Sequence, residues 1–459
     1  MLETAALLLF VAVLVTGVVM QFPLVLLLIV GWFIFFDYGL VRGFGMGELV
    51  RMSLAGVRSV GSVLLLFAII GSLTAAWRAS GTIPAITCWS AQLVGPRSVV
   101  PASFVLTAAM SMLVGSSFAA SATVGVICMV IGNALGANPV LLGGAIISGA
   151  FFGDRCSPMS SSAVLVAQIT QTDVFRNVGR MVRSAAVPTL LALVLYLVFG
   201  AVSAPGGSVP NFARDFAKSF VLAPYVVAPT LVILVLSLAK VDVRITMLAS
   251  LSTALVLCVG VQGVKLAELP RILLWGYHTT NEHIAHMVDG GGIMSMAEVA
   301  AIVAIASTYS GIFEGTNLLM GLRDQVIELS HRTTPFVGVL LTSLATTFVA
   351  CDQVVAIMLT RQLCDGVEHG GEGLALDLEN SAVVVPALVP WSTSCVGIVA
   401  FVGMPTSSIA CAFLPLFIPL WTLATSLWMQ RHADFVDTPA GRLQGFNAED
   451  DVRRWVAAA

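Results

Sequence analysis

The sequence predicts an all-α polytopic membrane protein. Of its 459 residues, 58% are apolar and only 10% are charged, and the mean hydropathy is +0.97. Soluble globular proteins have about 45–50% apolar and about 25% charged residues, so a polar surface could not cover this chain in water. Because one spanning helix takes roughly 20 apolar residues, we expect roughly 11–13 membrane segments, several of them broken or re-entrant.

Composition also excludes several classes of function. The net charge of −3 gives no support for binding nucleic acid. No G-x-x-x-x-G-K-[ST] loop is present, so any pumping has to draw on an ion gradient or on a separate ATPase subunit. The eight cysteines are scattered singly, as is typical of small buried apolar residues. We expect no enzyme activity and no bound cofactor.

Arginine positions predict which side of the membrane each linker occupies. Two linkers have clustered arginines: 41–58 contains Arg42, Arg51 and Arg58, and 171–184 contains Arg176, Arg180 and Arg183. Positive residues in short loops stay in the cytoplasm, so both linkers and the N-terminus are expected there. The start Met1-Leu2-Glu3 lacks the basic region of a cleaved signal peptide, so we expect the first apolar run to remain as a span.

We expect two repeats of opposite orientation. Three apolar runs, 185–203, 221–239 and 245–262, would cross the membrane after the second linker, so the runs starting at 59 and 292 would enter from opposite sides. RASGTIP resembles the later FEGTNLL, and SPMSSSAVL resembles PWSTSCVGI. Inverted repeats are the usual construction of secondary transporters, whose site lies between them at the bilayer midplane. The alternative is chance similarity between two Ser/Thr-rich helix breaks.

This reading divides the chain into five parts. They are an N-terminal helical hairpin with a cytoplasmic linker (1–56), a first transport repeat (57–184), connecting spans with an external loop (185–284), a second transport repeat (285–430) and a solvated C-terminal tail (431–459).

The first candidate site lies in GAIISGAFFGDRCSPMSSSAVLVAQ, residues 144–168. Gly153 and Pro158 should break the helix and free backbone carbonyls, which is tolerated inside a membrane only where protein or water lines the break. Hydroxyls at Ser157 and Ser160 add hard oxygen ligands, and Asp154 adds a charge that is costly within a span. The alternative is a structural bridge, near the membrane interface, between Asp154 and Arg155 or another arginine.

The second candidate site is LENSAVVVPALVPWSTSC, residues 378–395. Prolines interrupt this apolar run twice, which indicates another unwound segment. The candidate binding residues here are Glu379, Asn380, Trp391, Ser392 and Thr393. The alternative is a helix start capped by Asn380, with Trp391 in the aromatic belt of the membrane.

A third candidate is the pair Asp352-Gln353 within the apolar run TTFVACDQVVAIML. An intramembrane carboxylate is expected to be functional. Low dielectric favours the protonated form of a carboxyl group, so a proton could compete with a cation here. We therefore expect Asp352 to bind Na⁺ together with Asp154 and Ser157. The alternative is that Asp352 only caps a half-helix.

These segments, in this order, resemble the NhaC-type Na⁺/H⁺ antiporter family of inverted-repeat carriers. Asp154, Ser157 and Ser160 fall on the family's G-D-x-x-S-P-x-S motif, and Asp352-Gln353 fall on its D-Q pair. Glu379 falls on its E-[DN]-S motif, and Trp391 falls on its P-W motif. The resemblance implies alternating-access exchange of Na⁺ for H⁺ in the inner membrane of a bacterium, with Na⁺ and H⁺ as transported or coupling ions.

The chain also departs from the family pattern. Where NhaC-type antiporters read S-D-T-T-N after the proline, this chain has serines at 160–162 followed by Ala163 and Val164, and P-W-N-T becomes P-W-S-T. The resulting site has less charge and more room. A Na⁺- or H⁺-coupled carrier of an amino acid or a small carboxylate is therefore the alternative function. The expected partners are the lipid bilayer and a small cation or organic solute, and a homodimer is left open.

Overall fold

The computed structural model describes residues 2–20, 22–93, 95–203, 216, 218–239, 241–279, 285, 288–316, 333–350, 352–364 and 371–436. Over these ranges the chain is α-helical, and an isolated bridge between Tyr277 and Gly290 is the only strand-like pairing there. The expected all-α fold is confirmed. The tail expected over 431–459 lies outside the described residues from 437 onward, and the last helix continues to Val436.

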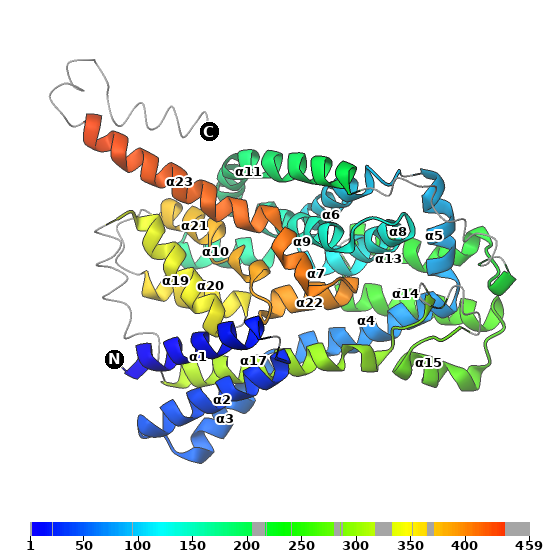
Figure 1. Cartoon of the computed structure of the whole chain (residues 1–459), viewed down its shortest axis with the longest axis horizontal. Coiled ribbons are helices and arrows are strands. Elements are labelled where there is room, and N and C mark those ends of the chain that lie inside the picture. The colour runs from blue at the N-terminus through cyan, green and yellow to red at the C-terminus, as the bar shows by residue number, and fades with distance from the viewer. Residues whose placement is uncertain are drawn as a thin grey trace.

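The helices follow one another with short breaks (Figure 1). The first set is α1 (Leu2–Val19), α2 (Leu24–Val41), α3 (Met46–Ser59), α4 (Gly61–Ala79), α5 (Thr82–Leu93) and α6 (Val99–Val114). The next set is α7 (Ser117–Ala120), a π-helical turn (Ser121–Gly125), α8 (Val126–Ala134), α9 (Pro139–Cys156), α10 (Ser161–Thr170) and α11 (Val174–Val202).

The second part of the chain continues in the same manner. The connecting region has a 3₁₀ turn (Pro224–Val227), α13 (Ala228–Leu238), α14 (Val243–Gly260), a 3₁₀ turn (Leu266–Glu268) and α15 (Leu269–Trp275). After it come a 3₁₀ turn (Ile293–Met296), α17 (Ala297–Thr316), α19 (Pro335–Ala350), α20 (Gln353–Leu363) and α21 (Gly371–Asn380). The last elements are a 3₁₀ turn (Val385–Leu388), α22 (Thr393–Val402), a 3₁₀ turn (Thr406–Cys411) and α23 (Phe413–Val436).

Seven helices in the described ranges are long and apolar enough to cross a membrane, or up to eight if a bent pair is counted as one span. The bent pair joins Gly371–Leu388 to Thr393–Val402 at an angle of 52°. Four further apolar helices are shorter, at 10–17 residues. The number of long spans is below the expected number of segments because helix breaks shorten the others. The chain is therefore a multi-pass membrane protein.

Helix lengths recur between the two expected repeats. α6 and α19 each have 16 residues, and each is followed directly by the start of another helix. α10 and α22 each have 10 residues, and each follows a proline-containing break. A duplication predicts helices of equal length in the same order in both repeats, and these two pairs have that arrangement. The opposite orientation of the two repeats and the boundaries of the five expected parts stay predictions.

The segment 41–58 differs from the expected linker. Most of it forms α3, which packs against α17 along small residues. A Cβ atom on Gly56 would lie 1.9 Å from the carbonyl oxygen of Ser307, and one on Gly311 would lie 1.9 Å from that of Met52. Such a close approach of two helices needs glycine at the crossing. Arginine spacing along the sequence could not reveal this packing, because it depends on glycines in a distant segment.

The centre of the molecule is built around α9. In Figure 1, α9, α7 and α22 lie in the middle, with α6 and α11 on one side and α4 and α17 on the other. α9 packs closely against α6, since a Cβ on Gly153 would lie 2.2 Å from the backbone nitrogen of Met112. Ser111 Oγ of α6 also donates a hydrogen bond to the Ala150 carbonyl over 2.5 Å. This packing fixes the end of α9, where the first candidate site begins.

Candidate functional site

Asp154 lies at the centre of the site, in the last turn of α9, and only 3% of its surface is exposed. Three neutral side chains donate hydrogen bonds to its carboxylate. Ser160 Oγ donates to Oδ1 over 3.1 Å, and Ser117 Oγ and Gln353 Nε2 each donate to Oδ2 over 3.3 Å. No arginine, lysine or histidine of the described ranges forms an ion pair with Asp154. The acid is therefore held in place by neutral donors, with no basic side chain of the described ranges in direct contact with it.

The predicted helix breaks bring helix N-termini to this acid. Two of its donors, Ser117 and Gln353, are the first residues of α7 and α20. Ser160 is the N-cap of α10. α22 joins the group through Ser394, whose Oγ donates to Gln353 Oε1 over 3.5 Å. Because a helix N-terminus carries positive partial charge, these ends stabilise an ionised Asp154.

Arg155 is fully buried but does not pair with its neighbour Asp154. A guanidinium has five N–H groups, and each has another acceptor here. Nε donates to the Glu379 carbonyl oxygen over 3.2 Å. Nη1 donates to the Met181 carbonyl oxygen over 2.8 Å and to Cys156 Sγ over 3.4 Å. Nη2 donates to Ser184 Oγ over 2.7 Å and to Asn380 Oδ1. The alternative of a structural bridge between Asp154 and Arg155 is therefore wrong.

Glu379 and Asn380 end α21, and both are fully buried. Asn380 Oδ1 accepts the hydrogen bond from Arg155, while its Nδ2 has no partner in the described part of the chain. Neither carboxylate oxygen of Glu379 has a partner there either. The alternative in which Asn380 caps a helix start is wrong, because Asn380 is the last residue of α21 and lies at its C-terminal end.

Asp352 is partly exposed and makes no hydrogen bond to Asp154 within the described ranges. It is the N-cap of α20, where its Oδ1 accepts hydrogen bonds from the backbone N–H groups of Val354 over 2.9 Å and Val355 over 3.2 Å. Its Oδ2 accepts a hydrogen bond from Thr393 Oγ1 over 3.1 Å. The capping alternative thus describes its contacts, and the role of Asp352 as an ion ligand stays a prediction.

The remaining predicted residues shape the breaks around the acid. Ser157 Oγ accepts a hydrogen bond from the Met159 N–H over 3.2 Å within the turn between α9 and α10. Trp391 Nε1 donates to the Phe348 carbonyl over 3.0 Å and so attaches the second break to α19. Ser392, the N-cap of α22, makes no capping hydrogen bond, and its buried Oγ has no partner among the residues described.

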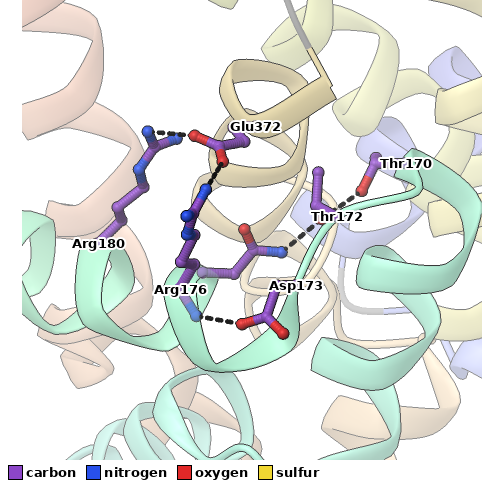
Figure 2. Close-up of polar contacts among 7 residues, drawn as sticks. Thr170, Thr172, Asp173, Arg176, Arg180 and Glu372 are labelled. Atoms are coloured by element: carbon purple, nitrogen blue, oxygen red, sulfur yellow. Dashed lines mark hydrogen bonds and ion pairs between the residues drawn. The ribbon is translucent and has the colours of Figure 1, made fainter.

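A cluster of ion pairs attaches α21 to α11 at the start of both helices (Figure 2). Glu372 accepts from Arg176 over 3.1 Å and from Arg180 over 2.5 Å. Asp173 caps α11 by accepting from the backbone N–H of Arg176 over 2.9 Å. Further along the same pair of helices, Arg155 bridges Asn380 to Ser184. α11 and α21 therefore hold Arg155 between them, through Ser184 on α11 and Asn380 on α21.

Sequence reasoning missed Ser117 and Arg155. Ser117 belongs to GSSFAASATVG, a segment without an acidic residue, so nothing in its composition marks it as part of a cation site. The available signal was its place, because it begins a helix after Gly115, whose φ of +74° ends α6 in the left-handed conformation. Arg155 was considered only as the bridge partner of Asp154, because adjacency in sequence does not reveal distant acceptors.

Broken helices that meet at a buried polar site among spanning helices are a common construction of secondary transporters. A family model described as the Na⁺/H⁺ antiporter family matches residues 3–176 and 149–428. The chain therefore belongs to the Na⁺/H⁺ antiporter family. It is a membrane antiporter and not an enzyme.

Curated relatives cover most of the chain. The chain is 25% identical over 407 residues to a malate-2H⁺/Na⁺-lactate antiporter of Bacillus subtilis, covering 85% of this chain and 86% of the relative. It is 27% identical over 372 residues to the arginine/ornithine antiporter ArcD of Halobacterium salinarum, covering 77% and 75%. It is 24% identical over 360 residues to the Na⁺/H⁺ antiporter NhaC of Alkalihalophilus pseudofirmus, covering 76% and 78%.

Proposed function

We propose that this antiporter exchanges Na⁺ for H⁺ by alternating access and that Asp154 binds the cation. The observation that carries the proposal is the missing counter-charge. Asp154 is buried, its three donors are neutral, and the adjacent Arg155 uses all its N–H groups elsewhere. A buried charge is costly unless it is paired, and a cation bound directly to Asp154 would supply the contact ion pair that Arg155 does not make.

The surroundings of Asp154 suit a small hard cation. The hydroxyl hydrogens of Ser117 and Ser160 point to the carboxylate, and Ser117 Oγ accepts no hydrogen bond within the described ranges, so its lone pairs are available to a cation. Ser160 Oγ already accepts from the Ser162 N–H over 3.2 Å. Oxygen atoms are the ligands that hard cations prefer. The broken helices around them belong to different segments of the chain, so a small movement between the segments can open the site. We place the protein in the cell membrane of a bacterium with its N-terminus in the cytoplasm.

Exchange of an organic solute is the second candidate. Two of the relatives are named for organic solutes, malate and lactate in one and arginine and ornithine in the other. Ser161 also stands where the family pattern has an aspartate, which leaves a less negative site. In this candidate, Na⁺ or H⁺ at Asp154 would be the coupling ion rather than the only cargo.

Purified protein in proteoliposomes tests the two candidates directly. A pH gradient is imposed and Na⁺, Li⁺ or K⁺ is added, and the rate at which the gradient dissipates is followed with a pH-sensitive dye. We expect Na⁺ to dissipate the gradient without any organic solute, and K⁺ to have no effect. If Na⁺ has no effect alone but labelled malate, lactate or arginine is exchanged, the second candidate replaces the first.

A further inference from the structure

We propose that Glu379 is the proton-binding residue of the exchange and that Arg155 couples it to the cation site at Asp154. This inference rests on the proposed function, because it assigns the proton and the cation to two different acids of one buried cluster. Three observations carry it: the hydrogen bonds that Glu379 lacks, the position of Glu379 in its helix, and the charge of the cluster.

Glu379 and Asp154 are both buried acids, but their surroundings are opposite. Asp154 accepts three hydrogen bonds at helix N-termini, which favours its ionised form. Glu379 is in the last turn of α21, where the helix end carries negative partial charge, and its carboxylate has no donor in the described part of the chain. Two acids whose environments differ in this way take different protonation states.

Arg155 does not supply the missing donor. Its Nε donates to the backbone carbonyl of Glu379 rather than to the carboxylate, and its other N–H groups have four further acceptors. The guanidinium is therefore held beside Glu379 without a direct hydrogen bond to the acid. In this arrangement Arg155 acts on both acids through its charge and is a positioning residue.

Arg155 and Asp154 are the charged groups that act on Glu379. The helices packed against α21 add no other charged group beside it. α10 and α19 carry no ionisable residue, and neither does α23 over residues 413–430. The ionisable residues of α11 and α20 are Arg176, Arg180, Arg183, Tyr196 and Arg361. Arg176 and Arg180 pair with Glu372 at the opposite end of α21, and Arg183 is exposed.

Charge balance then sets the stoichiometry. With Asp154 ionised, Arg155 charged and Glu379 protonated, the buried cluster is neutral. A bound Na⁺ adds one positive charge, and the loss of one proton from Glu379 restores neutrality. The reaction is Na⁺ plus Glu379–COOH giving bound Na⁺, Glu379–COO⁻ and one H⁺, which leaves to the side that the site faces. One Na⁺ exchanges for one H⁺ without net charge movement.

Proton release on Na⁺ binding tests the assignment. The full-length protein is kept in a weakly buffered solution with a pH dye, and bound Na⁺ and released H⁺ are counted together. At pH values where Glu379 is protonated, we expect the wild type to release one H⁺ for each Na⁺ that binds. Over the same pH range, its apparent Na⁺ affinity should increase about tenfold for each unit by which the pH increases. Glu379→Gln resembles the protonated acid permanently, so it should bind Na⁺ only weakly at every pH, without releasing a proton and without this pH dependence. Glu268→Gln, an exposed Glu-to-Gln control, should behave as the wild type.

The outcomes separate the two proposals. If Glu379→Gln still releases one proton per Na⁺, the role of Glu379 is overturned while Asp154 keeps its own. If Asp154→Asn still binds Na⁺ with unchanged affinity, the proposed cation site itself fails. Wild-type proteoliposomes give a measurement that needs no variant: an imposed membrane potential should leave the rate of Na⁺/H⁺ exchange unchanged. A rate that follows the potential contradicts one-for-one exchange.

Discussion

Gln353 and Asp154 are 199 positions apart in the chain, and Gln353 Nε2 donates a hydrogen bond to Asp154 Oδ2 over 3.3 Å. The same amide nitrogen donates to the Val383 carbonyl over 2.8 Å. The contact connects a residue of the expected first repeat with one of the expected second repeat. It lets a change at the cation site reach α20 and the break after α21.

Removing this amide should weaken both stability and Na⁺ binding. Gln353→Leu leaves the Val383 carbonyl without its side-chain donor and removes one of the two donors to Oδ2 of Asp154, at a cost of about 1–3 kcal/mol in the free energy of unfolding. Apparent Na⁺ affinity should fall as well, because an acid with fewer donors binds H⁺ more readily. Thermal unfolding and Na⁺ titration measure the two effects. Gln168→Leu is the control, since Gln168 is exposed on α10; equal losses in both variants would contradict the role of Gln353.

The close packing of α9 on α6 gives a second prediction. Gly153→Ala places a Cβ atom 2.2 Å from the Met112 backbone nitrogen, so one helix has to move and displace Asp154. We expect a loss of about 1–3 kcal/mol in stability from overpacking, together with a loss of exchange. Gly179→Ala is the matched control, because nothing lies within 4 Å of its Cβ position. A melting temperature that does not change in Gly153→Ala would show that α6 and α9 are farther apart.

Asp352 gives a prediction that separates a cap from an ion ligand. Asparagine and aspartate are both good N-caps, so if Asp352 acts only as a cap, Asp352→Asn should keep stability and Na⁺/H⁺ exchange near the wild type. Asp352→Ala removes the cap of α20 and should cost about 0.5–2 kcal/mol. Thermal unfolding and proteoliposome exchange check both variants. Loss of exchange in a stable Asp352→Asn protein would show that the negative charge itself is needed and would place Asp352 in the ion pathway.

Orientation is tested by labelling single cysteines. Arg183 and Lys265 are both exposed, and three expected crossings separate them. In a background without the natural cysteines, Arg183→Cys should react with a membrane-impermeant maleimide only from the cytoplasmic side, and Lys265→Cys only from the outside. Reaction from the same side would contradict the inverted orientation of the two repeats.

Most of the fold could be predicted from the sequence, because composition and helix breaks are local properties. Glycine and proline around residues 153–158 predicted the end of α9 and the start of α10, and Pro386 predicted the break after α21. Contacts between distant segments could not be predicted. Four of the five acceptors of Arg155 belong to α11 and α21, and no local pattern indicates that this arginine would turn away from Asp154.

The candidate site could be predicted in part for the same reason. Asp154, Ser160 and Gln353 were chosen as polar residues in apolar surroundings, and the structure brings them together. Asp352 met the same criterion, but it faces the backbone of α20 instead. Which face of a broken helix an acid occupies depends on the turn before it, and that turn is set by tertiary packing.

The central claim is that Asp154 binds the exchanged cation, and Na⁺-driven dissipation of a pH gradient by Asp154→Asn proteoliposomes tests it most directly. Asparagine keeps the shape of the side chain and removes the charge that a cation has to neutralise. We predict that Asp154→Asn inserts into the membrane, has a melting temperature near that of the wild type, and shows no Na⁺-dependent proton flux at any pH. Asp154→Glu keeps the negative charge and should give measurable flux. A stable Asp154→Asn protein that exchanges Na⁺ for H⁺ at the wild-type rate would contradict the claim.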